Sequence, residues 1–183
     1  MAFRTMSRIL IAYSTVDGHT QKIANRLKAG LEQAAHTTTL AEIGPGDHID
    51  PGAYSQIIVG ASIRYGKYRP ALFDFIESNR GVLESRPSAF FSVNLVARKE
   101  NKSTPDTNPY ILKTFRKNTS WVPDAMAVFA GKVDYARYSF WDRQVIRLIM
   151  LMTHGPTDAS ASIEYTNWQA VDSFAQRLAD LNQ

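Results

Sequence analysis

Cysteine is absent from this 183-residue chain, which excludes disulfides, thiolate metal sites, iron–sulfur clusters and a cysteine nucleophile. Long apolar runs are missing too. The first run, Ile9–Tyr13, is too short for a signal peptide, and none approaches the ~20 residues of a membrane-spanning helix. No repeat, low-complexity tract or Gly/Ser linker divides the chain. We therefore expect a single domain over residues 8–183, in a cytoplasmic protein.

Side-chain patterns for hydrolysis or metal catalysis are also lacking. The four histidines show no ligand spacing, and there is no Ser/His/Asp signature. We therefore predict no metal site and identify no catalytic residue. Any redox chemistry would have to come from a bound cofactor.

The charge balance is basic, with 21 lysines and arginines against 17 acidic residues. A basic protein attracts anionic partners, such as nucleic acid, a lipid surface or a carboxylate-bearing ligand. General solubility explains the same balance. Because the cations are dispersed and accompany no RNA- or DNA-binding motif, we expect no nucleic-acid partner.

Short, near-continuous apolar runs recur at 9–13, 56–60, 89–93 and 125–129. Strands buried on both faces of a parallel sheet have this pattern. A weaker run at 37–43 suits an edge strand.

Helical patterns separate these runs. Apolar residues share one helical face from Ile23 to Ala34, Pro70 stands where another helix would begin, and 104–117 has roughly helical spacing. Thr166 and Gln169 form a capping-box pattern before a closing helix. Strands alternating with helices predict an α/β fold, a doubly wound five-stranded parallel sheet with helices on both faces.

The most informative segment is the turn between the first strand and the first helix, made of Ser14, Thr15, Val16, Asp17, Gly18, His19 and Thr20. Backbone amides and the helix dipole make such a junction an anion site. The turn contains hydroxyl residues but lacks the lysine of a Walker loop. It therefore suits a single terminal phosphate such as that of FMN. The alternative is an ordinary capped helix.

Two further loops should meet this turn, because the carboxyl ends of parallel strands lie at one edge of the sheet. The first contains Ala61, Ser62, Ile63, Arg64, Tyr65 and Gly66, and the second contains Ser92, Val93, Asn94, Leu95 and Val96. Their polar groups and the Tyr65 ring could bind and stack on a flat heteroaromatic ring. Alternatively, Tyr65 only packs on the surface.

These loops resemble those of the flavodoxin family, since residues 15–20 are similar to its Thr-x-Thr-Gly-x-Thr phosphate loop. Asp17 stands where a hydroxyl residue is usual, and we expect it to turn away from the phosphate or to cap the helix. Three further segments, residues 60–66, 87–99 and 138–152, indicate a particular branch of flavodoxin-like proteins. They resemble the flavodoxin-like, menaquinone-dependent protoporphyrinogen IX dehydrogenases, bacterial enzymes of haem synthesis.

That resemblance implies FMN as cofactor, protoporphyrinogen IX as substrate, and menaquinone or another respiratory quinone as electron acceptor. We expect a hydride to pass from a porphyrinogen carbon to flavin N5. Thr157 and Asp158, where the chain returns toward its last helix, join the expected cofactor site. The rival functions are a flavodoxin-type electron carrier, which is typically acidic, and an NAD(P)H:quinone reductase.

A long insertion is expected at about 132–165, because some 35 residues separate the end of the fifth strand from the closing helix near Asn167. Its apolar stretch, Phe140–Met152, would span only ~20 Å as a helix. It could cover the sheet, lie on a membrane interface, or wall a groove for a tetrapyrrole. The second interpretation places the protein peripherally at the inner face of the cell membrane. An oligomer is possible.

Basic residues near the same edge could pair with the propionates of a porphyrinogen. The candidates for substrate binding are Arg64, Lys67, Arg98, Arg137 and Arg143. A solvated basic rim is the plainer explanation for each of them.

Overall fold

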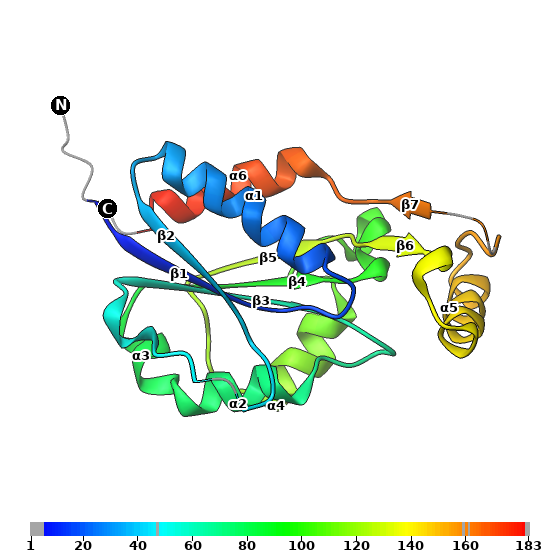
Figure 1. Ribbon diagram of the computed structural model, residues 1–183, viewed down its shortest axis with the longest axis horizontal. Coiled ribbons are helices and arrows are strands. Elements are labelled where there is room, and N and C mark those ends of the chain that lie inside the picture. The colour runs from blue at the N-terminus through cyan, green and yellow to red at the C-terminus, as the bar shows by residue number, and fades with distance from the viewer. Residues whose placement is uncertain (1–5, 47, 159, 161, 182–183) are drawn as a thin grey trace.

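Five parallel strands form the central sheet of the computed structural model (Figure 1). They are β1 (Arg8–Ser14), β2 (Thr37–Glu42), β3 (Gln56–Ser62), β4 (Ser88–Val93) and β5 (Ala125–Phe129), in the order β2-β1-β3-β4-β5. The predicted fold class, including the edge position of β2, is confirmed. Chain order reverses beside β1, and ligands of such sheets bind at this switch point, outside the carboxyl ends of the strands.

The structure describes residues 6–46, 48–158, 160 and 162–181. Positions 159 and 161 of the expected insertion, and 182 and 183 at the end of the expected domain, lie outside the described residues.

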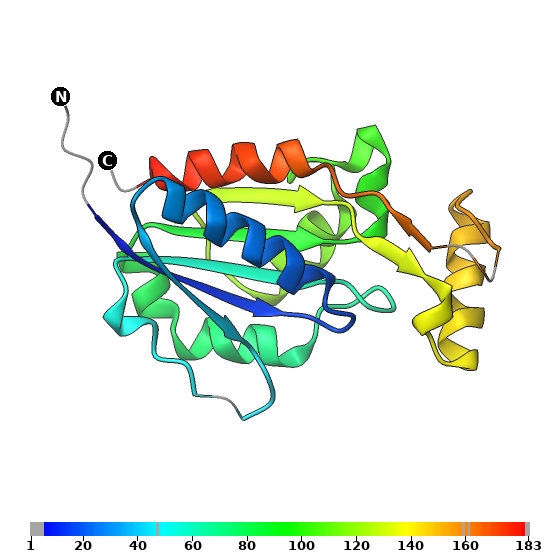
Figure 2. The ribbon, with the colours of Figure 1, turned by 45° about the horizontal axis from the view of Figure 1, so that its top comes forward.

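Helices cover both faces of the sheet (Figures 1 and 2). One face carries α1 (His19–Gln33) and α6 (Trp168–Ala179), and the other carries α2 (Pro70–Ser78), α3 (Arg80–Ser85) and α4 (Arg116–Asn118). Alternate residues of β1 enter separate cores. Ile9 and Ile11 pack toward α1 and α6, whereas Leu10 and Ala12 pack toward α2, as side-chain alternation along a strand requires.

Two helix boundaries differ from their predictions. The helix expected from Thr104 begins later, as a π-helical segment Tyr110–Phe115 that continues into α4. Pro109 disfavours helical backbone at the residue before it, and Thr104 instead accepts from Asn108 N in a turn. The N-cap of α6 is Asn167, whose side chain accepts from Ala170 N, rather than Thr166.

The described residues between 132 and 164 extend beyond the carboxyl edge of the sheet (Figure 2). They contain β6 (Lys132–Asp134) and β7 (Ser162–Glu164), which pair antiparallel, and the helix α5 (Phe140–Met152). Ile146 and Met150 of α5 pack on Tyr135 and Tyr138 in a small core of their own. This helix therefore does not cover a face of the sheet, and that interpretation of the segment is wrong. Among the described residues, no helix is both long and apolar enough to cross a bilayer.

Candidate functional site

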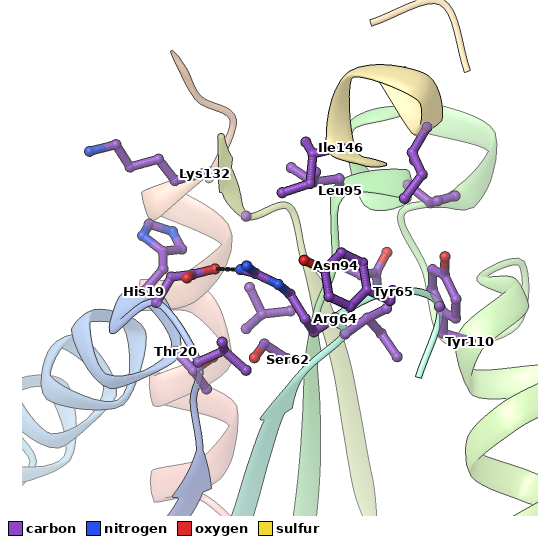
Figure 3. Close-up of a pocket in the computed structure, with 18 of the residues that line it drawn as sticks. His19, Thr20, Ser62, Arg64, Tyr65, Asn94, Leu95, Tyr110, Lys132 and Ile146 are labelled. Atoms are coloured by element: carbon purple, nitrogen blue, oxygen red, sulfur yellow. Dashed lines mark hydrogen bonds and ion pairs between the residues drawn. The ribbon is translucent and has the colours of Figure 1, made fainter. Parts of the chain in front are cut away.

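A pocket opens at the carboxyl ends of β1, β3 and β4, beneath α5 (Figure 3). Its walls come from the three loops that the sequence singled out, together with the segment after β5. Arg64 and Tyr65 rise into it from the loop after β3, while Leu95 and Ile146 close it from above (Figure 3). The pocket thus lies at the switch point of the sheet, where this fold binds its ligands.

The turn after β1 is built to leave amides available. Gly18 is the N-cap of α1 and has a φ of 81°, which glycine adopts without steric cost, and no side chain caps this helix. Thr15 Oγ1 accepts from Gly18 N at 3.0 Å. Arg69 Nη1 donates to the Thr15 carbonyl at 2.9 Å and fastens the turn to the start of α2.

Two hydroxyls in this turn are buried and unsatisfied. Ser14 is 1% exposed and Thr20 is fully buried, and neither side-chain oxygen has a hydrogen-bond partner within the described part of the chain. Leaving a buried hydroxyl unpaired costs about 1–3 kcal/mol, so such groups usually await a ligand or water. Two hydroxyls beside an uncapped helix N-terminus are a donor set that fits a phosphate.

Asp17 also lines the pocket, and its carboxylate is paired with a cation. Its Oδ2 accepts from Arg64 Nη1 at 2.6 Å, and Arg64 Nη2 also lies 3.1 Å from Asp142 Oδ2 of α5. The Arg64 guanidinium lies over the ring of Tyr65, 5.0 Å from its centroid, and over that of Tyr138 at 5.1 Å. Arg64 therefore links the turn after β1 to α5 across the pocket.

Tyr65 sits at the tip of a tight turn. Arg64 and Lys67 exchange backbone hydrogen bonds around it, and both Tyr65 (φ 50°) and Gly66 (φ 76°) have left-handed backbone. A left-handed conformation is uncommon for a tyrosine and is characteristic of functional sites. Tyr65 is 44% exposed and lines the pocket, so a planar ligand could stack on its ring.

Asn94 lines the pocket, but its side chain is already engaged. Its Oδ1 accepts from Ala97 N and from Asn108 Nδ2, while its Nδ2 donates to Ser92 Oγ. Ser92 Oγ in turn meets the Tyr68 hydroxyl at 2.8 Å, and burial raises the Tyr68 pKa well above its ordinary value. This buried network fixes the shape of the loop after β4.

His19 links α1 to the segment before α6. Thr166 Oγ1 donates to the Ala130 carbonyl at 2.7 Å, so it can accept from His19 Nε2 at 2.6 Å. Burial lowers the pKa of His19, although Glu164 nearby opposes the shift. Burial therefore favours the neutral ring, and the bond to Thr166 favours the tautomer with its proton on Nε2.

Most predicted cofactor residues share this pocket. Those that line it are Thr15, Val16, Asp17, His19, Thr20, Ser62, Ile63, Arg64, Tyr65, Gly66, Val93, Asn94, Leu95 and Val96. Ser14, Gly18, Ala61 and Ser92 lie behind or beside its wall. Thr157 and Asp158 are not among its lining residues, and Asp158 accepts from Ser160 instead.

The predicted substrate-binding cations divide into two groups. Arg98 lines the pocket but donates to the carbonyls of Leu95 and Thr153. Arg143 lies outside it and donates to the Tyr135 carbonyl. Lys67 and Arg137 are exposed outside the pocket. Only Arg64 and Arg98 therefore reach the pocket.

Several lining residues were missed by sequence reasoning. They are Tyr110, Gly131, Lys132, Tyr138, Ile146, Ile149 and Thr153. Gly131 and Lys132 directly follow β5 at the same sheet edge, so the rule that found the other loops could have found them. Nothing in the sequence pattern aims Tyr110 at this pocket, whereas the interpretation that Phe140–Met152 walls a groove anticipated the α5 segment without naming Ile146 or Ile149. In the described ranges, no cluster of three or more His, Asp or Glu residues is suited to a metal ion.

Comparison with known proteins agrees with this geometry. A family model described as a flavodoxin domain matches residues 10–160. Flavodoxin 2 from Bacillus cereus superposes with a TM-score of 0.54 at 19% identity, over 94% of this chain and 98% of that one. Fold and site together define a flavodoxin-like protein, and this class implies a flavin cofactor.

Curated sequences narrow the class. A protoporphyrinogen IX dehydrogenase (quinone) from Escherichia coli strain K12 is 42% identical over 95% of this chain and 96% of its own length. The protein of that name from Leishmania major is 41% identical over 95% of this chain and 75% of its own. The chain belongs to the quinone-dependent protoporphyrinogen IX dehydrogenase family and is an oxidoreductase with a flavodoxin domain.

Proposed function

We propose that this protein oxidises protoporphyrinogen IX to protoporphyrin IX, with FMN as its flavin and a respiratory quinone, menaquinone, as electron acceptor, in haem synthesis. The observation that carries the reaction is the 42% identity to a quinone-dependent protoporphyrinogen IX dehydrogenase along 95% of the chain. We further propose that residues 8–183 form one domain, into which 132–165 are inserted.

The choice of FMN rests on the turn after β1. Ser14 and Thr20 offer unpartnered hydroxyls, and α1 offers the amides of an uncapped first turn. These groups would hold a terminal phosphate, which FMN has and riboflavin lacks. Bound there, FMN would accept two electrons, as a hydride, in each of the three oxidation steps that convert the porphyrinogen to the porphyrin, and would pass them to the quinone.

The chain's own residues position the reactants. Tyr65 would stack against the flavin ring, and the backbone around Ser62 and Asn94 would bind its polar edge. Arg64 holds Asp17 and Asp142 together and so keeps α5 over the pocket, where Leu95 and Ile146 make an apolar roof. An apolar roof excludes water and suits a flat tetrapyrrole or a quinone.

A membrane surface is the proposed source of the quinone. The outer face of α5 exposes Trp141 (76%), Leu148 (57%) and Met152 (72%), which lie on one side of the helix. Soluble proteins seldom leave such a patch uncovered, and an amphipathic helix of this kind binds the lipid interface through its apolar face. This arrangement supports peripheral binding at the inner face of the cell membrane.

The test is a reconstituted turnover assay. The purified protein is loaded with FMN, mixed with protoporphyrinogen IX and a menaquinone analogue without oxygen, and followed by porphyrin fluorescence. We expect fluorescence to rise only when the protein, FMN and the quinone are all present. A protein that is reduced rapidly by NADPH, and that leaves the porphyrinogen unchanged, would be a NAD(P)H:quinone reductase instead.

A further inference from the structure

A second cavity, which we name the basic groove, adjoins the flavin pocket. It has a volume of about 180 Å³. Its walls combine the outer side of the turn after β1 with β6, β7 and the start of the segment that leads to α5. The lining residues that matter here are Lys22, Lys132, Asp134, Arg137 and Glu164.

The basic groove and the flavin pocket share a wall. Asp17, His19, Lys132 and Tyr138 line both cavities. In Figure 3, Lys132 lies beside His19 at the margin of the pocket. A ligand whose ring lies in the outer part of the flavin pocket can therefore extend a short side chain into the groove.

Among the described residues, three cations and three acids line the groove, but they are unevenly paired. Lys22 pairs with Glu164 at 2.9 Å, but Lys132 and Arg137 share a single carboxylate, with Asp134 Oδ2 3.2 Å from Lys132 Nζ and 3.8 Å from Arg137 Nε. Asp17, the remaining acid, is committed to Arg64. Lys132 and Arg137 thus bring two positive charges to one negative charge, and the side chain of Arg137 is 75% exposed.

We propose that the basic groove is a carboxylate subsite, in which Lys132 and Arg137 bind a propionate of the porphyrinogen. This inference rests on the proposed function. An arginine fork and an ammonium group suit a carboxylate, and one more anion would balance the charges around Asp134. The flavin phosphate is not the expected occupant, because Thr15 and Thr20 line the flavin pocket and not the groove.

Porphyrin binding tests the subsite directly. The FMN-loaded protein is titrated with protoporphyrin IX and with its dimethyl ester, in the same detergent, and binding is followed by porphyrin fluorescence. The ester keeps the ring and loses the charges. We expect the wild type to bind the free acid about tenfold more tightly than the ester, the ratio for one good charge-assisted contact.

Three variants make the result specific. Arg137→Met should reduce the acid-to-ester ratio to within about twofold, whereas Asp134→Asn, which releases both cations, should increase it. Lys28→Gln is the matched control, since it removes a lysine paired with Glu32 elsewhere on α1, and it should leave the ratio unchanged. The affinity for FMN, measured in parallel, should stay constant in all three and also shows that each variant is folded.

The outcomes separate the two proposals. If the wild type prefers the free acid and Arg137→Met retains that preference, the carboxylate subsite is refuted and the proposed function stands. If Arg137→Met weakens FMN binding instead and leaves the ratio unchanged, the groove binds the flavin phosphate, and the inference is likewise wrong. If the wild type binds neither porphyrin, the proposed function itself fails.

Discussion

Replacing Thr20 by valine should strengthen the apoprotein and weaken its hold on FMN. The Thr20 side chain is fully buried, and its hydroxyl has no partner among the described residues. Valine keeps the shape and removes a polar atom that is unsatisfied without ligand, so we expect the free energy of unfolding of the apoprotein to rise by about 1 kcal/mol. The same change deletes a hydrogen bond to a charged phosphate, worth about 1.5–3 kcal/mol, and should weaken FMN binding roughly 10- to 150-fold.

Thr38→Val is the matched control for this experiment. Thr38 of β2 is also buried with an unsatisfied hydroxyl, but it is not among the residues that line the pocket. It should give a similar gain in stability and no change in FMN affinity. Urea denaturation measures the first quantity, and quenching of flavin fluorescence measures the second.

The ligand provides a second control, because riboflavin lacks the phosphate. Thr20→Val should leave riboflavin affinity nearly unchanged while FMN affinity falls. Equal affinity of the wild type and Thr20→Val for FMN would refute the assignment of the turn after β1 as the phosphate site. So would equal weakening by Thr38→Val.

Three further changes have definite expected results. Arg64→Met removes both ion pairs that join the turn after β1 to α5. Because these pairs are partly exposed, the free energy of unfolding should fall by only about 1 kcal/mol, while amide hydrogen exchange in α5 should accelerate. Unchanged exchange in α5 would contradict the linking role of Arg64. Trp141→Glu combined with Leu148→Glu puts two charges on the exposed face of α5 and should abolish co-sedimentation with anionic vesicles. Porphyrinogen oxidation by a water-soluble quinone should be retained. If the double variant still sediments with the vesicles, α5 is not the membrane contact. Burial lowers the pKa of His19, so the unfolded chain binds more protons than the folded chain just below pH 6.5. The contribution of His19 to stability is therefore complete above that pH and is lost as pH falls through the folded pKa. The melting temperature of His19→Gln should decline less on acidification than that of the wild type, and identical pH profiles would rule this out.

The sheet was predictable because each strand can be recognised from its own local sequence. Runs such as 56–60 and 89–93 are apolar at nearly every position, and only strands covered on both faces require this. The turn after β1 was predictable for a similar reason, since hydroxyls and glycine at a strand-to-helix junction have a direct chemical use.

Long-range pairings were not predictable in the same way. Arg64 looked like a ligand-binding cation, but its two carboxylate partners, Asp17 and Asp142, are 47 and 78 positions away and meet only in the folded chain. Arg98 and Arg143 also donate hydrogen bonds to backbone carbonyls of the segment after β5. The path of that segment decides which cations remain available, and periodicity carries no information about it.

The predicted start of α6 was wrong because two neighbouring residues are both suitable N-caps. At the start of α6, Thr166 and Asn167 are both good N-caps. Thr166 bonds Ala130 and His19 instead, which leaves the cap to Asn167. The tertiary contact decides between two locally acceptable choices.

The most direct measurement separates flavin reduction from flavin re-oxidation in the absence of oxygen. Stopped-flow absorbance follows the flavin of the FMN-loaded protein after mixing with protoporphyrinogen IX, and a menaquinone analogue is added in a second mixing step. We predict loss of the oxidised flavin absorbance after the first mixing, and its return together with porphyrin formation when the quinone arrives, because the six electrons lost by the porphyrinogen require three two-electron reductions of the flavin. A flavin that stays oxidised in the presence of the porphyrinogen, in protein shown to bind FMN, would contradict the account.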